Sequence, residues 1–385
     1  MEFQQIQMSQ ERGLQKLLVP MLITLFERDP RRVWTFDRFF QETDDILSLE
    51  PITYLTLFPH HSPFDKLYLP QLQSIGELKQ ALGELWKKPN SDLRTVLYQG
   101  SCLSDWIQDD EQVYDMPHTD TDTPLIPLPA DVTDSDGGAS IPEPSMVKIM
   151  SEELSFTGTS ISDLNVAKEM CGIVALINRR TTVLAAFQQH LLSLTHKLRC
   201  ELRRDMAEVK KTFHLTMEMF DVIKGTANMG SWSQQETHNF KQVTEKMSIV
   251  EERLQSAGNA VKLPFEDAQW NFDGKKCMKQ TQRASEEAES WLRELVQFRK
   301  TVEKARYSTD HMERCQEAVK SHLQAVYKEA VSLWSGQCFQ RTTLLRNSFL
   351  DWYKSYLQVC NEVAQCQEHL SSAVSLLTQL FKVGS

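Results

Sequence analysis

The sequence lacks the features that define membrane-spanning and secreted proteins. No run of about 18 uncharged apolar residues occurs, so we expect no membrane span. The first residues, MEFQQIQMSQERG, contain no apolar core of the kind found in a secretory signal. These absences predict a cytoplasmic protein.

Cysteine spacing and net charge exclude further classes. The eight cysteines form no CxxC pair, and the ten histidines do not flank them at zinc-finger spacing, so we expect reduced thiols and no metal or other cofactor. The formal net charge is −10. Nucleic-acid binding requires a cationic surface, and the chain as a whole does not supply one, so we expect no nucleic-acid partner.

Composition divides the chain into four regions. Residues 1–48 are rich in apolar and aromatic residues at helical spacing, and residues 49–130 mix short strand-like runs with one helical segment. The segment 130–145 combines Asp, Ser, Gly and Pro with few large apolar residues, which predicts a flexible linker over 131–159. Residues 160–385 are almost free of proline and strongly periodic, which predicts long helices.

Residues 49–130 predict a small sheet that holds one helix. Strands are expected at 51–58, 64–69, 93–98 and 124–128, with a helix from Ser74 to about residue 88. Ser74 and Glu77 are spaced as a capping box. The prolines at 124 and 127 suit an edge strand better than a central one. Two strands, a helix, a strand and a late strand follow the order of the β-grasp fold.

The segment 95–103, TVLYQGSCL, resembles the ubiquitin segment that turns through a glycine into a leucine. Gly100 would supply the positive φ that this turn requires. Leu97 falls where ubiquitin carries the isoleucine of its binding patch. A leucine there can be a core residue or an exposed docking residue. Strand alternation places Val96 and Tyr98 in the core, so we expect Leu97 to face outward, as a docking patch with Gly100.

Residues 12–47 contain two apolar helical segments separated by an Asp-Pro turn. The pattern RGLQ-x-LL-x-P-x-L is followed by W-x-F-D-x-F-F-x-E-T-x-D-I-L, which begins at Trp34 and ends at Leu47. This pattern resembles the last helices of the kinase domain in IKK-related serine/threonine kinases, the TANK-binding kinase and inhibitor-of-kappaB kinase epsilon type. In that family the motif leads directly into a ubiquitin-like domain, so residues 1–48 would be a remnant of the kinase C-lobe.

The resemblance implies a kinase, but the phosphate-handling motifs do not occur in these 385 residues. A phosphotransferase needs a Gly-rich loop, a catalytic-loop Asp and a metal-binding Asp. No GxGxxG, HRD or DFG sequence is found. We therefore expect no catalytic activity, no ATP site and no catalytic residue in this chain.

Residues 160–385 predict a helical bundle that acts as a scaffold. Apolar residues recur every three or four positions, and large aromatic side chains favour a packed bundle over a two-stranded coiled coil. A capping box at Ser233 and Glu236 begins a second helix, and Ser335-Gly336 is expected to kink or split a later one. The residues expected to pack the scaffold or form its dimer contact are Leu184, Phe187, Leu191, Leu194, Phe349, Trp352 and Tyr356.

The family resemblance extends weakly into these helices. Asp163–Lys168 resembles the start of the scaffold-dimerisation domain of the same kinases, and 297–307 resembles a segment of its last helix. The expected fold class is therefore α+β and multidomain: a small β-grasp ubiquitin-like domain followed by a long all-α helical-bundle scaffold and dimerisation domain.

Two charged segments have two interpretations each. The stretch 105–136 carries ten acidic residues and no Lys or Arg, and it is either a solvated loop or a docking surface for a basic partner. The basic segment 196–211 is either a solvated helix face or a contact for that acidic stretch or for ubiquitin.

Three functional hypotheses follow. The first is a non-catalytic regulatory and dimerisation region of an IKK-related kinase in innate immune (interferon and NF-kappaB) signalling. Its expected partners are a second copy, a full-length kinase, signalling adaptors and ubiquitin. The second is part of an active Ser/Thr kinase whose catalytic domain precedes this chain. The third is a coiled-coil structural protein unrelated to kinases.

Overall fold

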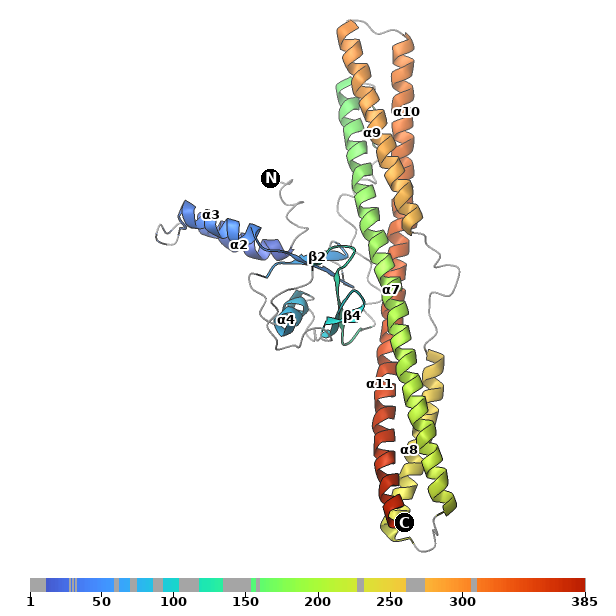
Figure 1. The fold of residues 1–385 in the computed structure, drawn as a ribbon. Helices are drawn as coiled ribbons and strands as arrows, with labels where there is room; N and C mark the ends of the chain where they lie inside the picture. Colours follow the sequence, from blue (N-terminus) through green and yellow to red (C-terminus); the bar gives the residue numbers. More distant parts are fainter. Residues whose placement is uncertain are drawn as a thin grey trace. The chain divides into compact units, whose positions relative to one another are not determined.

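The computed structural model describes residues 12–27, 29, 31, 33–58, 62–69, 75–85, 93–103, 118–133, 154–156, 160–226, 232–260, 274–305 and 310–384. The chain has an α+β fold, in which long helices accompany a small mixed five-stranded sheet (Figure 1). It divides into two compact units. The first contains Met1–Ala130, Gly138–Leu191 and Gln269–Asn347, and the second contains Asp131–Gly137, Leu192–Ala268 and Ser348–Ser385.

Two helices precede the sheet. Helix α2 spans Arg12–Leu25, and α3 spans Phe36–Leu47. Thr35 begins α3 because its side chain accepts a hydrogen bond from the Arg38 amide, which satisfies one free N–H of the first turn. Helix α2 lies against strand β2 of the sheet.

The sheet has the strand order β2-β1-β5-β3-β4. Its strands are β1 (Ile52–Leu55), β2 (Phe64–Leu67), β3 (Leu93–Tyr98), β4 (Ser101–Cys102) and β5 (Leu125–Pro129). The β1–β5 pair is parallel, and the other pairs are antiparallel. Helix α4 (Ile75–Leu85) packs Leu78 and Leu82 onto the sheet face that carries Tyr54, Val96 and Leu125.

The prediction that the late strand lies at the edge is wrong, because β5 lies in the middle of the sheet. Its ladder to β1 has one register pair, Tyr54 with Leu125, so Pro127 and Pro129 lie beyond it. Proline is tolerated in the centre of this sheet because the ladder on that side is so short. The expected Ser74 cap of α4 lies outside the described residues.

The hairpin between β3 and β4 turns at Gln99 and Gly100, whose φ angles are 44° and 82°. Two consecutive positive φ angles are typical of a type I′ turn, which matches the twist of the flanking strands. Gly100 therefore has the conformation expected from the sequence. Gln99 also has a positive φ, which is sterically unfavourable for a residue with a side chain.

The described residues of 160–384 form five long helices and one π-helical segment. They are α7 (Ser160–Thr226), α8 (Gln234–Ala260), α9 (Gly274–Ala305), α10 (Asp310–Ser332), the π-helix η4 (Leu333–Phe339) and α11 (Gln340–Gly384). Helix α7 has 67 residues and is about 100 Å long. At Ser335-Gly336, where a kink or split was expected, the chain remains helical and takes the π-helical form of η4.

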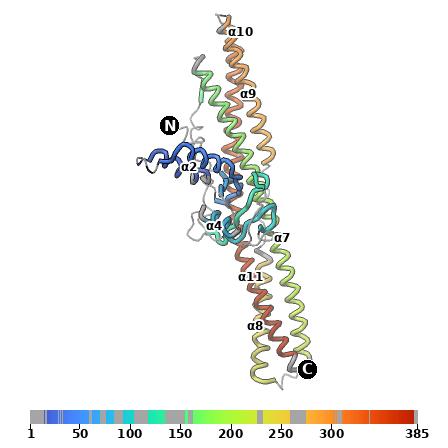
Figure 2. The backbone as a smooth tube through the Cα atoms, turned by 60° about the vertical axis from the view of Figure 1, so that its left-hand side comes forward, coloured from blue at the N-terminus to red at the C-terminus, as the bar shows by residue number. Residues whose placement is uncertain are grey.

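In the first unit, α9 and α10 lie side by side (Figure 2) and share one buried core with the first part of α7. Lys320 of α10 forms a buried ion pair with Asp163 at the start of α7. Leu154 and Phe156 pack against this core, so part of the expected linker is ordered onto the helices. The remainder of 131–159, apart from 131–133, lies outside the described residues.

The second unit contains the rest of α7, α8 and the rest of α11. The capping box is confirmed: the Ser233 amide donates to Glu236 Oε2 over 2.6 Å, and the Glu236 amide donates to Ser233 Oγ over 3.2 Å. Phe220 of α7 stacks on Phe240 of α8, with ring centroids 4.7 Å apart. Lys246 of α8 donates a hydrogen bond to Ser372 of α11, so each helix of this unit contacts another.

Candidate interaction site

The N-terminal helix pair exposes an unusual amount of apolar surface. Phe26 is 83% exposed and Phe36 is 76% exposed, and no residue of α3 is buried. The other large apolar side chains exposed on the pair are Val19, Ile23, Val33, Phe40 and Leu47. Several large exposed apolar side chains within one short segment are typical of an interface with another protein.

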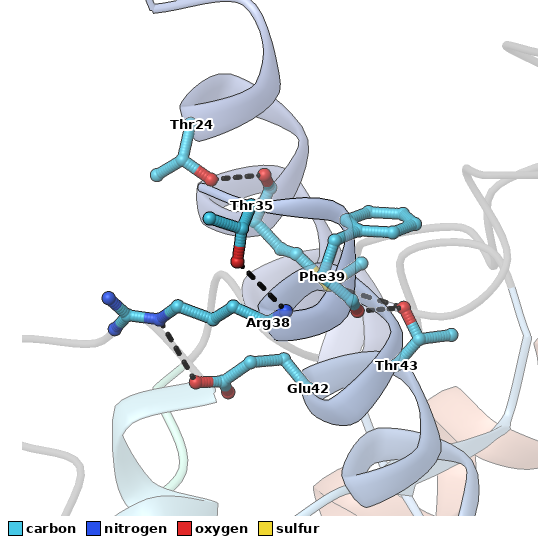
Figure 3. Close-up of polar contacts among 7 residues, drawn as sticks. Thr24, Thr35, Arg38, Phe39, Glu42 and Thr43 are labelled. Atoms are coloured by element: carbon cyan, nitrogen blue, oxygen red, sulfur yellow. Dashed lines mark hydrogen bonds and ion pairs between the residues drawn. The ribbon is translucent and has the colours of Figure 1, made fainter. Parts of the chain in front are cut away.

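Local contacts within the pair hold this surface in place (Figure 3). The Arg38 guanidinium lies 4.5 Å from the centre of the Trp34 ring and 4.0 Å from Glu42 Oε1. Thr43 Oγ1 donates to the Phe39 carbonyl over 2.7 Å and contacts Met21 Sδ at 3.7 Å. Thr43 therefore joins α3 to α2, while the phenylalanines at 36 and 40 of the same motif face solvent.

A hollow of about 870 Å³ lies between α2 and α3. Leu17, Met21 and Trp34 line its apolar wall, and Glu42 and Asp45 contribute carboxylates. Its size is within the range of protein binding pockets, and its open apolar wall suits the side chains of a protein partner. A second hollow of about 360 Å³ lies beside Val19, Ile23 and Phe26 on α2.

The prediction that Leu97 faces outward is wrong, because its side chain is only 2% exposed. Alternation does direct the Leu97 side chain to the other face of the sheet from Val96 and Tyr98. This second face, however, is also buried. It carries Leu55, Ile126 and Leu128, all buried, and Leu97 pairs with Ile126 across β3 and β5. Leu97 is therefore a core residue, and no docking patch with Gly100 is present at that position.

Two helices of the same unit contact the turns beside this second face. Arg346 of α11 donates from Nε to the Leu57 carbonyl over 2.8 Å, and its guanidinium lies 5.8 Å from the Phe58 ring. His190 of α7 lies 2.9 Å from the Thr121 carbonyl and packs edge-on against Phe64. These contacts attach the sheet to the long helices.

The seven residues expected to pack the scaffold or form its dimer are all buried within one chain. Leu184, Phe187, Leu191 and Leu194 lie on α7, while Phe349, Trp352 and Tyr356 form an aromatic row on α11. Their packing role is confirmed. A dimer contact cannot use them in this conformation, because their surfaces are already occupied.

The second unit exposes a different apolar stripe on α7. Leu215, Met219 and Val222 are exposed and are spaced by four and three residues, so they share one face of the helix. Ile249 of α8 and Phe381 of α11 are also exposed. This stripe is the part of the long helices that is best suited to contact a second chain.

Burial changes the acidity of several thiols. Desolvation raises the pKa of Cys171 to about 11, with a smaller contribution from the negative charge of Glu289. Burial likewise raises the pKa of Cys366. Raised values keep both thiols protonated and unreactive near neutral pH.

No protein-family model matches the chain.

Metal and membrane sites find little support in the described part of the chain. Within it, no group of three or more His, Cys, Asp or Glu side chains is arranged to bind a metal. By length and composition the segment Ser162–Gly225 of α7 could cross a membrane, but the core helix of a soluble bundle passes the same test. The apolar residues of this segment include Val174 and Phe187, which are buried inside the protein. Their burial explains why α7 is so apolar.

Sequence reasoning missed the α7 stripe and Arg346. In 209–222 one apolar series, which includes Val209, Phe213 and Phe220, runs beside a second series formed by Leu215, Met219 and Val222. The presence of two series in one helical segment would have indicated a second contact surface. A lone arginine between Leu345 and Phe349 in an apolar series would likewise have indicated a buried polar partner.

Proposed function

We propose that this chain is the non-catalytic regulatory and dimerisation region of an IKK-related serine/threonine kinase in innate immune (interferon and NF-kappaB) signalling in the cytoplasm. The observation that carries the proposal is the order of elements. A helix pair with the Trp34–Leu47 motif leads into a mixed sheet that holds one helix, and the long helices α7 to α11 follow.

The sheet supports a ubiquitin-like module in this proposal. The order β2-β1-β5-β3-β4, the parallel central pair and the packing of α4 across one face are the features of a β-grasp fold. Its second face, which contains Leu97, is used for attachment to the long helices and not for a free ubiquitin-type partner. The module would therefore fix the N-terminal helix pair relative to α7 and α11 in the first unit.

The N-terminal pair is proposed to be the end of a kinase C-lobe. Phe26, Phe36 and Phe40 are exposed here, which is consistent with surfaces that the rest of that lobe would cover. Residues of this kind lower solubility when they are left uncovered. In this proposal the catalytic groups belong to that lobe, and the present chain positions it.

Dimerisation is assigned to the α7 stripe of the second unit. Leu215, Met219 and Val222 present apolar side chains at coiled-coil spacing without burial in the chain. Such a dimer would bring two kinase domains together, and a chain without a kinase domain would compete with the full-length kinase for the same surface. Signalling adaptors and ubiquitin remain further proposed partners.

Light scattering on the purified chain tests the proposal. We expect a dimer at micromolar concentration and a monomer for the double variant Leu215→Glu, Met219→Glu. Leu344→Glu is the matched control, because Leu344 is also exposed on a long helix but lies outside the stripe. A monomeric parent chain, or a dimer that the stripe variant leaves intact, contradicts the assignment.

The exposed N-terminal surface also favours the second hypothesis, that the chain is part of an active kinase. The two hypotheses differ in what the chain itself does with ATP. We expect no ATP turnover above background from this chain, and turnover would show that phosphate-handling residues were overlooked. A coiled-coil protein unrelated to kinases is less well supported, because the five-stranded sheet over residues 52–129 has no role in one.

A further inference from the structure

The hollow between α2 and α3 combines an apolar floor with a rim of carboxylates. Of the apolar residues that line it, Met21 is buried, and the others are half-buried or exposed, so water covers hydrocarbon here. Apolar side chains of a ligand that displaced this water would bind favourably. These floor residues are Leu17, Pro20 and Met21 of α2, Trp34 before α3, and Ile46 and Leu49 at the C-terminal end of α3.

The rim of the hollow is negatively charged. Among the described side chains that line it, the charged ones are the half-buried Glu42 and the exposed Asp45. Arg38 lies 4.0 Å from Glu42 and 4.5 Å from the centre of the Trp34 ring, so one positive charge stands against two negative charges. Repulsion disfavours nucleotides, phosphopeptides and anionic lipid head groups at this rim. A ligand that fits the hollow is therefore positively charged.

The C-terminal end of α3 strengthens this preference for a cation. The helix dipole places partial negative charge at the last turn, where Lys and Arg are stabilising. Helix α3 has no basic residue in its last turn, and Asp44 and Asp45 lie there instead. These carboxylates raise the energy of the free helix end, and a cation supplied by a ligand would lower it.

The size of the hollow and its apolar floor decide between cationic ligands. Within the described part of the chain no group of three or more His, Cys, Asp or Glu side chains is arranged to bind a metal. A small amine would leave most of the floor in contact with water. An amphipathic helix would satisfy both parts of the hollow, because apolar residues at a spacing of three or four cover a groove while its basic residues reach the rim. A volume of about 870 Å³ gives room for several side chains of such a helix.

We propose that this hollow is the docking site for a cationic amphipathic helix of a partner protein. Large apolar side chains of that helix lie on Leu17, Trp34 and Leu49, and a lysine or arginine one turn away pairs with Glu42 and Asp45. The exposed phenylalanines of the helix pair do not line the hollow, and the α7 stripe belongs to the second unit. The site therefore requires neither the kinase assignment nor the dimer.

Fluorescence anisotropy with the full chain and a labelled synthetic peptide tests the proposal. The peptide has about 15 residues, long enough to form a helix, with leucines on one face and lysines on the other. One control peptide has serines in place of the leucines, and a second has glutamates in place of the lysines. We expect the first peptide to bind at least about tenfold more tightly than either control, with an affinity that falls as salt is added.

Variants of the chain locate the binding site. Glu42→Gln with Asp45→Asn should weaken binding of the leucine–lysine peptide about tenfold and reduce its salt dependence, because two ion pairs are lost. Asp37→Asn is the matched control, since it removes a carboxylate of α3 that does not line the hollow, and it should bind like the parent chain. Leu17→Lys should abolish binding. If Leu17→Lys does not fold, the double carboxylate variant still decides the question, because it leaves the apolar contacts of the helix pair unchanged.

Three results would overturn the proposal. Equal binding of the serine–lysine peptide would show a general attraction of cations to a chain with a net charge of −10. An unchanged affinity in the double carboxylate variant would place the peptide elsewhere on the chain. A change in the oligomeric state of that variant, measured by light scattering without peptide, would assign the hollow to a second copy of the chain.

Discussion

The buried ion pair between Lys320 and Asp163 gives the sharpest test of how the first unit is held together. The side chains of Lys320 and Asp163 are 7% and 1% exposed, so removal of either leaves a charge with little access to water. Loss of one partner from a buried pair costs about 3–5 kcal/mol. The two single variants are not equivalent, however, because the charge that remains is placed differently in each.

Asp163→Asn leaves the Lys320 ammonium with Glu317 Oε2 at 3.6 Å and the Phe156 ring at 5.7 Å. Glu317 is mostly exposed and solvent-screened, so it offsets little of the loss, and we expect a cost of about 3 kcal/mol. Lys320→Met leaves the Asp163 carboxylate in the first turn of α7, where the helix dipole stabilises a negative charge by up to about 2 kcal/mol. We therefore expect Lys320→Met to cost less than Asp163→Asn.

Urea denaturation followed by circular dichroism measures both costs and that of the double variant. Because the chain has two compact units, the transition of the first unit is separated by a fit with two transitions. Asp163→Asn with Lys320→Met should cost clearly less than the sum of the single variants, since no unpaired charge remains. Strictly additive costs, or a larger cost for Lys320→Met, would refute the argument from burial.

Three further predictions concern other contacts. Arg346→Met should lower the free energy of unfolding by about 1–3 kcal/mol, because it leaves the Leu57 carbonyl without its donor; an unchanged urea midpoint would argue against that contact. Leu97→Ala should cost about 2–5 kcal/mol if the residue is buried as described, whereas an exposed Leu97 would give almost no change in the same titration. The free energy of unfolding should fall between pH 9 and pH 11, because the Cys171 thiol ionises near 9 in the unfolded chain while its folded pKa is about 11. Cys171→Ala should remove about 2–3 kcal/mol of that loss, as measured by urea titrations at both pH values.

Periodic patterns predicted the long helices well because their signals are local. Apolar spacing placed α7, and the Ser233–Glu236 capping box placed the start of α8. An irregularity near Ser335-Gly336 was also predictable, although its form as a continuous π-helical segment was not. In each case a few neighbouring residues determine the backbone.

The errors arose where contacts between distant segments decide the outcome. Leu97 was expected to be exposed because alternation gives only its direction, and that direction leads to a second face that distant segments cover. The central position of β5 depends on its pairing with β1 and β3 and not on its own prolines. Similarly, the α7 residues buried in one chain could not be separated from those left for a partner before the helices were packed together.

The most direct test of the proposed dimer is cross-linking at the exposed stripe of α7. In a Cys200→Ser background, Met219→Cys should form a covalent dimer rapidly under mild oxidation, while Leu344→Cys, at an exposed position away from the stripe, should not. If Met219→Cys stays monomeric, or if the two variants cross-link at equal rates, the long helices do not associate through this surface and the assignment of the chain as a dimerisation region fails.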